Sequence, residues 1–590
     1  MRSCTIILAF CFLFGACQDK PSPQTNPTEH SDSPNKVFEE WKNTFVESLW
    51  AQYPDWGVSN GYYKHAAVLK IPNQAERDAS KAFIDKNLEE LKAIDTAGLS
   101  VENATDWLMV RDQLKASQWY LSSFLDYQWN PANYNVADAL SLILSAEYAP
   151  LPQRLADIGS KMALIPDYFR AAQANINTPT KEHTELAILQ NKGALGVFDN
   201  ITDSLKTKGI DEEKRQQWTA QIDSCKKAIN GYVSFLEQLL EKGKKDPKAF
   251  RDFRIGKETF AQKFAHDINS GFSAEDMYQK ALLHKQDLHK EMVRLSREIW
   301  AKYMGNTPQP KDSLKMVKAL IEKIAQKHVK PEEFVSAIKK QIPELTEFVN
   351  KHNLLRLDPT KPLEVRETPE YMRGVAGASI SAPGPYDKDA PTFYNVTPLD
   401  GYTPERAESY LREYNHYILQ ILNIHEAIPG HYAQLVYSNQ SPSIIKSVLG
   451  NGAMVEGWAV YTERMMLEEG YGNNEPEMWL MYYKWNLRVS CNTIIDYGIH
   501  AMGMSKEEVM HILQDEAFQE AAEAAEKWRR ATLSQVQLCS YFSGFKEIYE
   551  FRETLKKEQG KEFDLRSFHE RFLSYGSAPI KYVKQMMAQK

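Results

Sequence analysis

The body of the chain is poor in cysteine. Three of the six cysteines fall within the first seventeen residues, which leaves only Cys225, Cys491 and Cys539 beyond them. These three form an odd number without paired metal-type spacing, so a disulfide framework is excluded as the stabilising device. At most one pair can form among them.

The chain also lacks a strong charge of either sign. Its 71 Lys and Arg against 78 Asp and Glu give a net charge of −7, and no dense basic stripe interleaved with aromatic residues occurs. A nucleic-acid partner would favour such a basic face, so no nucleic acid is expected as a partner. With 43% hydrophobic and 25% charged residues, the composition excludes a disordered, collagen-like or multi-span membrane protein.

Two further patterns are missing. No internal repeat of fixed period occurs, which argues against a solenoid. No Gly-x-Ser-x-Gly elbow occurs where a strand turns into a helix, which argues against a serine hydrolase. A chain of 590 residues is instead expected to form one large domain or a two-lobed body.

The N-terminus reads as an export signal. Arg2, an apolar run over 6–14 and two small residues predict a signal peptide over residues 1–16. The segment ending at Cys17 resembles a bacterial lipobox, with phenylalanine instead of the usual leucine three positions before the cysteine. We therefore expect a lipidated Cys17 and a flexible tether over 17–36, rich in Pro, Ser, Asn and Gln. The protein would be exported and anchored in the bacterial cell envelope, facing the periplasm or the cell surface. The alternative is a plain secretory signal in which Cys17 is incidental.

Most of the remaining chain has helical periodicity, so residues 37–590 are predicted to be a mainly α catalytic domain. Apolar residues recur at helical spacing from Phe38 onward, with breaks at 243–247 and 305–308. Prolines interrupt this pattern between 354 and 398, where 377–382 and 392–396 are predicted to be short strands. The expected architecture has two helical lobes, about 37–353 and 354–590, with a small β-sheet near the active-site cleft.

A helix beginning at Thr403 and Pro404 leads into His425-Glu426-Ala427-Ile428-Pro429-Gly430-His431. Zinc-peptidase helices place two histidines four residues apart, whereas these are six apart and would lie about 120° from a common face on an ideal helix. Proline removes an intrahelical hydrogen bond, and glycine accepts unusual dihedral angles. We therefore predict that the helix breaks at Pro429-Gly430, which returns His431 to the side of His425.

A third ligand is expected on the next helix. Glu456 lies among small and apolar residues, where a carboxylate is costly to bury unless it is paired or binds a metal. Together, His425, His431 and Glu456 leave a fourth position open for water, as in catalytic zinc sites. These N and O donors favour Zn²⁺, while Mn²⁺ or Co²⁺ stay open. Glu426, beside the first histidine, is the expected general base.

At these residues the chain resembles the bacterial family catalogued as domain of unknown function 885, whose members carry a His-Glu-Ala-x-Pro-Gly-His signature. The similarity spans most of the mature chain and includes segments 53–57, 367–371, 456–459, 495–500, 537–544, 568–569 and 576–580. Where the family often has proline and glycine before Gln537, this chain has Ser534 and Gln535. The family is similar to gluzincin-type helical zinc peptidases, which bind substrate in a deep cleft between two helical halves. The resemblance implies the same three ligands and the same base.

Other candidate residues follow from the same resemblance. Related helical peptidases place a His and a Tyr downstream of the ligands to stabilise the oxyanion, which suggests His500 and Tyr541 here. Asp496 lies four residues before His500 and would orient its imidazole on a helix. His569 is another candidate for the cleft. For His500 and Tyr541, core packing with a satisfied polar tip is the competing interpretation.

The expected activity is hydrolysis of peptide bonds by a metal-activated water. A peptide could add as a strand to the edge of 377–382, and Arg488, Arg529 or Arg530 could bind a C-terminal carboxylate, unless these arginines are surface charges. One alternative is a zinc amidase acting on cell-wall or acylated amino-acid substrates. Another is a lipoprotein that captures peptides without catalysis; the presence of Glu426 favours an enzyme.

Overall fold

The computed structural model describes residues 33–368, 377–387 and 390–588. The predicted signal peptide and the predicted lipidation site, Cys17, lie outside these residues. Helix α1 begins at Pro34 and is capped by the hydroxyl of Ser33, so the last residues of the predicted tether belong to a helix instead. Among the described residues, no helix is both long and apolar enough to cross a bilayer.

The first part of the chain is entirely helical. Its helices are α1 (Pro34–Gln52), α2 (Pro54–Ser59), α3 (Gln74–Ala93), α4 (Val101–Trp119), α5 (Asp126–Trp129), α6 (Ala137–Ser145), α7 (Leu151–Met162), α8 (Ile165–Asn175), α9 (Lys181–Ser204) and α10 (Glu212–Lys245). Four more precede the sheet: α11 (Lys257–Asp267), α12 (Ala274–Met304), α13 (Ser313–Ile324) and α14 (Phe334–Lys351). The predicted breaks at 243–247 and 305–308 are confirmed by the ends of α10 and α12.

The second part begins with a small sheet. Its strands are β1 (Leu363–Glu367), β2 (Ala378–Ser381) and β3 (Thr392–Val396). The helices that follow are α15 (Pro404–Glu413), α16 (His416–Glu426), α17 (His431–Asn439), α18 (Ile444–Val448), α19 (Gly452–Glu468), α20 (Pro476–Met502), α21 (Lys506–His511), α22 (Ala521–Leu533), α23 (Cys539–Gln559), α24 (Leu565–Ser574) and α25 (Ile580–Ala588). The mainly α class with a small sheet is therefore confirmed.

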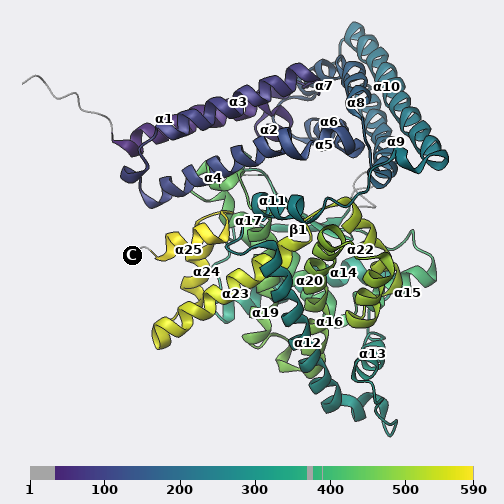
Figure 1. The fold of residues 1–590 in the computed structure, drawn as a ribbon, viewed down its shortest axis with the longest axis vertical. Helices are drawn as coiled ribbons and strands as arrows, with labels where there is room; N and C mark the ends of the chain where they lie inside the picture. Colours follow the sequence, from purple (N-terminus) through teal and green to yellow (C-terminus); the bar gives the residue numbers. More distant parts are fainter. Residues whose placement is uncertain (1–32, 369–376, 388–389, 589–590) are drawn as a thin grey trace, which may run out of the picture.

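Apolar residues gather in two clusters. The smaller cluster is drawn from residues between Val58 and Leu236, whereas the larger one joins α1, α3 and α4 to the elements from α11 onward. Figure 1 shows α7 to α10 standing together beside one end of the long α3 and α4, apart from the body that holds α12 to α25. The two hydrophobic clusters do not follow the predicted lobe boundary near residue 354. That boundary stays a prediction.

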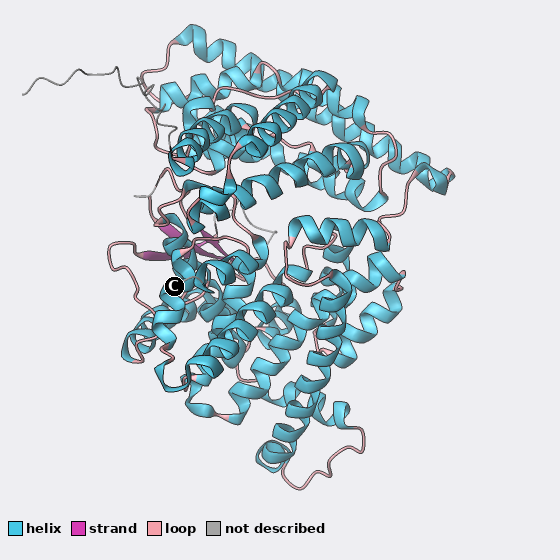
Figure 2. Ribbon diagram, turned by 60° about the vertical axis from the view of Figure 1, so that its left-hand side comes forward, coloured by secondary structure: helices cyan, strands magenta, loops and turns pink. Residues whose placement is uncertain are grey.

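The sheet has the order β1-β3-β2, with β1 parallel and β2 antiparallel to β3. Both predicted strands are confirmed, while β1, between Pro362 and Pro369, was not predicted. Figure 2 shows the strands at the junction between the N-terminal helices and the lower body. The hydroxyl of Tyr394 on β3 donates a 2.8 Å hydrogen bond to Asn423 of α16, so the sheet packs against the helix that carries His425.

Two glycines allow a close crossing of α19 and α23. A Cβ atom added to Gly457 would lie 2.3 Å from the backbone of Gly544, and one added to Gly544 would lie 1.8 Å from the carbonyl oxygen of Ala453. Only glycine permits this approach of two backbones. The crossing fixes α19, which carries Glu456, against α23, which carries Tyr541.

The helix predicted from Thr403 to the first histidine is in fact two helices. Thr403 caps α15 as expected, with its hydroxyl accepting from the N–H of Arg406. The chain then turns at Tyr414, and the side chain of Asn415 accepts from the first N–H groups of α16. An asparagine so placed starts a new helix, because it satisfies backbone donors that would otherwise lack partners.

Candidate metal centre

The predicted helix break lies between His425 and His431. Helix α16 ends at Glu426, and α17 starts at His431 with Gly430 as its N-cap residue. A Cβ atom on Gly430 would lie 1.9 Å from the carbonyl oxygen of His425, so this tight turn requires glycine. The indole N–H of Trp458 donates to the carbonyl oxygen of Pro429 at 2.9 Å and ties the break to α19.

The break brings both histidines to one point beside Glu456. Their ring centroids lie 4.7 Å apart, and one donor atom from each of His425, His431 and Glu456 falls within 4.8 Å of the others. Oε2 of Glu456 is 3.6 Å from Nε2 of His425 and 3.4 Å from Nε2 of His431. Donors bound to zinc at 2.0–2.1 Å in a tetrahedron would be separated by about 3.4 Å. The donor set and its spacing therefore fit a zinc ion.

Glu463 is a functional residue that the sequence analysis missed. Nδ1 of His425 donates to Oε1 of Glu463 at 2.7 Å, which leaves Nε2 free to bind a metal. Glu463 is fully buried and also accepts a 3.0 Å hydrogen bond from the indole of Trp485. It follows Glu456 by seven residues on α19, and this spacing places both carboxylates on one face. This seven-residue spacing from Glu456 is the sequence signal by which Glu463 could have been predicted.

The charges around the donors favour a cation. Burial lowers the pKa of His425, but the carboxylates of Glu456 and Glu463 outweigh burial and raise it to about 10. Burial raises the pKa of Glu456, yet the two imidazoles bring it well below its usual range. The carboxylates thus favour a positive charge at the three donors, either as a proton on an imidazole or as a metal ion in place of that proton.

Glu426, the predicted base, lies beside this cluster. Burial raises the pKa of its carboxyl group, while the neighbouring imidazoles of His431 and His425 lower it in part. A carboxylate with a raised pKa is a better proton acceptor near neutral pH than an ordinary one. The position of Glu426 and the raised pKa of its carboxyl group are those that a general base requires.

His500 and Asp496 are not brought to the cluster. The imidazole of His500 hydrogen-bonds through Nε2 to the carbonyl oxygen of Ala531, at 2.8 Å. It lies fifteen residues beyond Trp485 on α20, which is about 22 Å along the helix axis. The structure thus shows His500 in a core contact, and its role as an oxyanion donor stays a prediction. Its periodicity on a buried helix reflects core packing.

Asp496 has a different role from the predicted one. Its carboxylate accepts from the backbone N–H groups of Val536 and Leu538, at 3.1 Å each, while His500 Nε2 is 3.8 Å away. Burial raises the pKa of Asp496 to about 7. The residue holds the turn before α23 and does not orient the imidazole.

Tyr541 lies near the centre, whereas His569 belongs to the protein core. The hydroxyl of Tyr541 accepts a 2.9 Å hydrogen bond from Arg530. Burial, and then the charge of Glu456, raises the pKa of Tyr541, as expected for a phenol close to that ligand. His569 is fully buried between the hydroxyl of Tyr461 and the carbonyl oxygen of Leu354, so it is a core residue.

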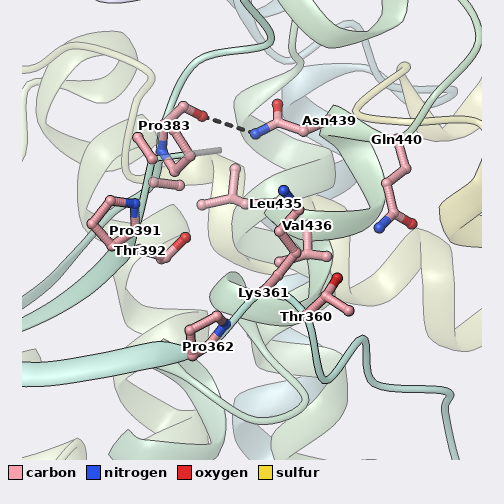
Figure 3. A pocket seen from close by; sticks show the side chains of 12 residues that line it. Thr360, Lys361, Pro362, Pro383, Pro391, Thr392, Leu435, Val436, Asn439 and Gln440 are labelled. Carbon is pink, nitrogen blue, oxygen red and sulfur yellow. Dashed lines mark hydrogen bonds between the residues drawn. The ribbon is translucent and has the colours of Figure 1, made fainter. Parts of the chain in front are cut away.

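A pocket lies one to two turns from His431 on α17. Its volume is about 320 Å³, and its lining includes Leu435, Val436, Asn439, Pro362, Pro383 and Pro391. Residues four apart on a helix share a face, so Leu435 and Asn439 continue the face that carries His431. Figure 3 shows the hydrogen bond from Asn439 to the carbonyl oxygen of Pro383, which ties α17 to the segment after β2.

Fold and site together define a mainly helical protein with a buried centre of two histidines and one carboxylate. The profile described as "Bacterial protein of unknown function (DUF885)" matches residues 54–587. The chain is 52% identical to a candidate lipoprotein of unknown function from Shewanella oneidensis, whose structure it matches with a TM-score of 0.85 over 94% of this chain and 100% of that one. The chain therefore belongs to the DUF885 family.

A more distant solved structure shows the same fold. A candidate lipoprotein from Colwellia psychrerythraea is 17% identical and matches with a TM-score of 0.75 over 94% of this chain and 98% of that one. No curated protein matches the chain.

Proposed function

We propose that the protein is an exported zinc-dependent peptidase. The observation that carries this proposal is the convergence of His425, His431 and Glu456 within 4.8 Å, with Glu426 beside them. Two histidines and one carboxylate leave room for water and substrate, which is the arrangement of catalytic zinc sites. Bound zinc supplies a Lewis acid that acidifies water and polarises the scissile carbonyl.

The residues of the chain divide the remaining tasks. Glu426 takes a proton from the attacking water while the water oxygen bonds to the carbonyl carbon. It then gives that proton to the leaving amine as the C–N bond breaks. Glu463 holds His425 in the tautomer that presents Nε2. The hydroxyl of Tyr541, polarised by Arg530, donates to the developing oxyanion.

Two surfaces next to the centre suit a peptide. Strand β2 is an edge strand in the described sheet, and a peptide can add to such an edge through main-chain hydrogen bonds. The pocket beside Leu435 offers room for an apolar side chain of that peptide. Both features favour a peptide over a small soluble amide as substrate.

The experiment combines metal analysis with activity. Glu426→Gln should retain one zinc per chain and lose peptide hydrolysis, whereas His431→Ala should lose the zinc. Loss of zinc in Glu426→Gln, or full activity without its carboxylate, would overturn the assignment of roles.

We also propose that the protein is a lipoprotein of the cell envelope. The lipobox-like segment ending at Cys17 and the similarity to two candidate lipoproteins support this. Cys17→Ala should move the protein from the membrane fraction to the soluble fraction and abolish labelling by radioactive fatty acid. Unchanged membrane association and labelling would contradict an anchor on this cysteine.

A further inference from the structure

Three cations from two helices gather on one side of the candidate metal centre. Arg488 lies on α20, while Lys527 and Arg530 lie one turn apart on α22; we call these three residues the cationic cluster. Glu523 contacts Arg488 at 2.5 Å. The charge of Glu523 acts on all three residues of the cluster, so three positive groups share this carboxylate.

Another acidic residue nearby is paired with a lysine. Glu413 forms a buried ion pair with Lys484 at 2.7 Å. Its charge also acts on Arg488 and Lys527, but with Lys484 included the site holds four cations and two carboxylates, which leaves an excess of positive charge.

Two members of the cluster have unused hydrogen-bonding capacity. The side chain of Lys527 is buried, at 4% exposure, and no hydrogen bond or ion pair joins its ammonium group to another residue in the described part of the chain. Nη1 of Arg488 is likewise buried without a hydrogen-bond partner. Burial, and then repulsion from Arg488, lowers the pKa of Lys527 well below its usual range. Such an arrangement is costly alone and is relieved when an anion binds.

Short chains of contacts connect the cluster to the metal centre. Arg530 donates to Tyr541, the residue that lies near Glu456. The guanidinium of Arg488 lies over the ring of Trp485, 5.0 Å from its centroid, and the indole of Trp485 donates to Glu463. An anion held by the cluster would therefore be part of a ligand that also reaches the metal.

The sheet edge has a direction relative to the cluster. The N–H of Thr397 donates to the carbonyl oxygen of Gly377, so alternate residues of β2 pair with β3 while the backbone groups of Ala378 and Ile380 point to the outer edge. At its C-terminal end, β2 runs through Ser381 into the segment that lines the apolar pocket.

The N-terminal end of β2 lies toward the cluster. A Cβ atom on Gly377 would lie 2.1 Å from the hydroxyl of Tyr410, whose ring is 4.6 Å from that of Tyr414. Tyr414 in turn lies beside Trp485, at 6.1 Å between centroids. A peptide that pairs antiparallel with β2 therefore has its C-terminal end on the side of Arg488 and Lys527.

On the basis of the proposed function, we infer that the cationic cluster binds the free α-carboxylate of a peptide substrate, which makes the enzyme a carboxypeptidase. Arginine pairs with carboxylates through two parallel hydrogen bonds, and a buried lysine adds a charge-assisted one. The substrate class is peptides with an unblocked C-terminus, from which the enzyme releases the last one or two residues.

A binding experiment tests this inference independently of turnover. Immobilised, zinc-loaded Glu426→Gln protein is equilibrated with a pool of N-acetylated tetrapeptides, supplied once as free acids and once as C-terminal amides. Retained peptides are quantified by mass spectrometry. The free acids should be retained about 10- to 100-fold more strongly, since hydrogen bonds to charged groups each contribute about 1.5–3 kcal/mol. Equal retention of acids and amides would overturn the inference.

Variants locate the preference. Lys527→Met should reduce the preference for acids about 10-fold and leave retention of amides unchanged. Arg529→Gln is the matched control, because Arg529 is half exposed and faces Glu526 at 3.9 Å. An undiminished preference in Lys527→Met, or a preference that is lost in the control, contradicts the assignment. Melting curves establish that each variant is folded.

Turnover separates failure of this inference from failure of the proposed function. If the wild-type enzyme is active and cuts internal bonds equally well in free acids and amides, it is a peptidase that does not bind the C-terminal carboxylate. If free acids bind more strongly but the zinc-loaded wild type hydrolyses no peptide, the carboxylate-binding role of the cationic cluster is retained and the proposed peptidase activity is refuted.

Discussion

Nδ1 of His425 lies 2.7 Å from Oε1 of Glu463, inside the protein and out of contact with solvent. This contact decides which imidazole nitrogen faces the other ligands, because a neutral histidine has one donor and one acceptor nitrogen. In the proposed zinc site, Glu463 would act on the metal through His425, as a positioning residue.

Replacing this carboxylate is expected to weaken metal binding. Glu463→Gln should reduce zinc affinity about 10- to 100-fold, the usual effect of losing such a partner. Competition with a zinc chelator of known affinity measures the change. Glu469→Gln, an exposed substitution just after the same helix, should leave affinity unchanged. Equal affinity in the Glu463 variant and wild type would show that the contact does not tune the site.

The sequence predicted the convergence of His425, His431 and Glu456 better than it predicted the residues around them. His425, Glu426 and His431 form a local motif. The Pro429-Gly430 pair within it predicted the helix break that brings the two histidines together. Glu463 and Trp485 were missed, because their importance depends on how α19, α20 and α16 pack, which no local pattern states.

His500 shows where such an expectation needs the structure. A histidine on a buried helix matched the expectation drawn from related peptidases, but its imidazole hydrogen-bonds to the carbonyl oxygen of Ala531 and packs on Phe253 and Phe260. The break between α15 and α16 was also missed, although Asn415 is a typical N-cap residue. In both cases the apolar periodicity is continuous. It therefore indicates neither where a polar side chain such as His500 points nor where one helix ends and the next begins.

Gly430 should be indispensable to the break in the metal-binding helix. An added methyl group would meet the carbonyl oxygens of His425 and Ile424, at 1.9 and 2.3 Å. Gly430→Ala is therefore expected to lower the free energy of unfolding by about 1–3 kcal/mol or more and to reduce zinc content. Denaturant unfolding and metal analysis provide the measurements.

A glycine with open space provides the comparison. A Cβ atom on Gly452, at the start of α19, meets no atom within 4 Å, so Gly452→Ala should be neutral or slightly stabilising. Similar effects of both substitutions would mean that the close approach at Gly430 is not what defines the site.

Three buried histidines should make the fold sensitive to mild acid. Burial lowers the pKa of His284, His500 and His569 to about 4. Unfolded histidine has a pKa near 6.5, so between these values the unfolded chain binds more protons and the native state loses stability as the pH falls. Above about pH 6.5 their contribution is complete.

The expected loss from pH 7 to pH 5 is about 2 kcal/mol for each histidine. Urea unfolding at both pH values measures it. His284→Gln, which can keep a hydrogen bond to Asn486, should change the difference by about the 2 kcal/mol of its own histidine. Identical pH dependence of variant and wild type would contradict a buried neutral imidazole at this position.

His500 should matter for stability and not for catalysis. His500→Gln removes a buried ring that packs on Phe253 and Phe260, so a loss of about 1–3 kcal/mol in unfolding free energy is expected. Zinc content, kcat and KM of the folded variant should match those of the wild type. A large decrease in kcat with normal zinc would restore His500 as a candidate oxyanion donor.

Tyr541 should behave in the opposite way. Its hydroxyl is held by Arg530 close to Glu456, and an oxyanion donor acts in the transition state more than in the ground state. Tyr541→Phe is therefore expected to lower kcat about 100-fold, corresponding to about 3 kcal/mol, with zinc content and KM little changed. Tyr549→Phe is the matched control on the same helix, since that hydroxyl lies 3.4 Å from Glu468, and full activity is expected for it. An unchanged kcat in Tyr541→Phe would leave the metal and Arg530 as the groups that stabilise the oxyanion, whereas a rise in KM alone would make Tyr541 a substrate-binding residue.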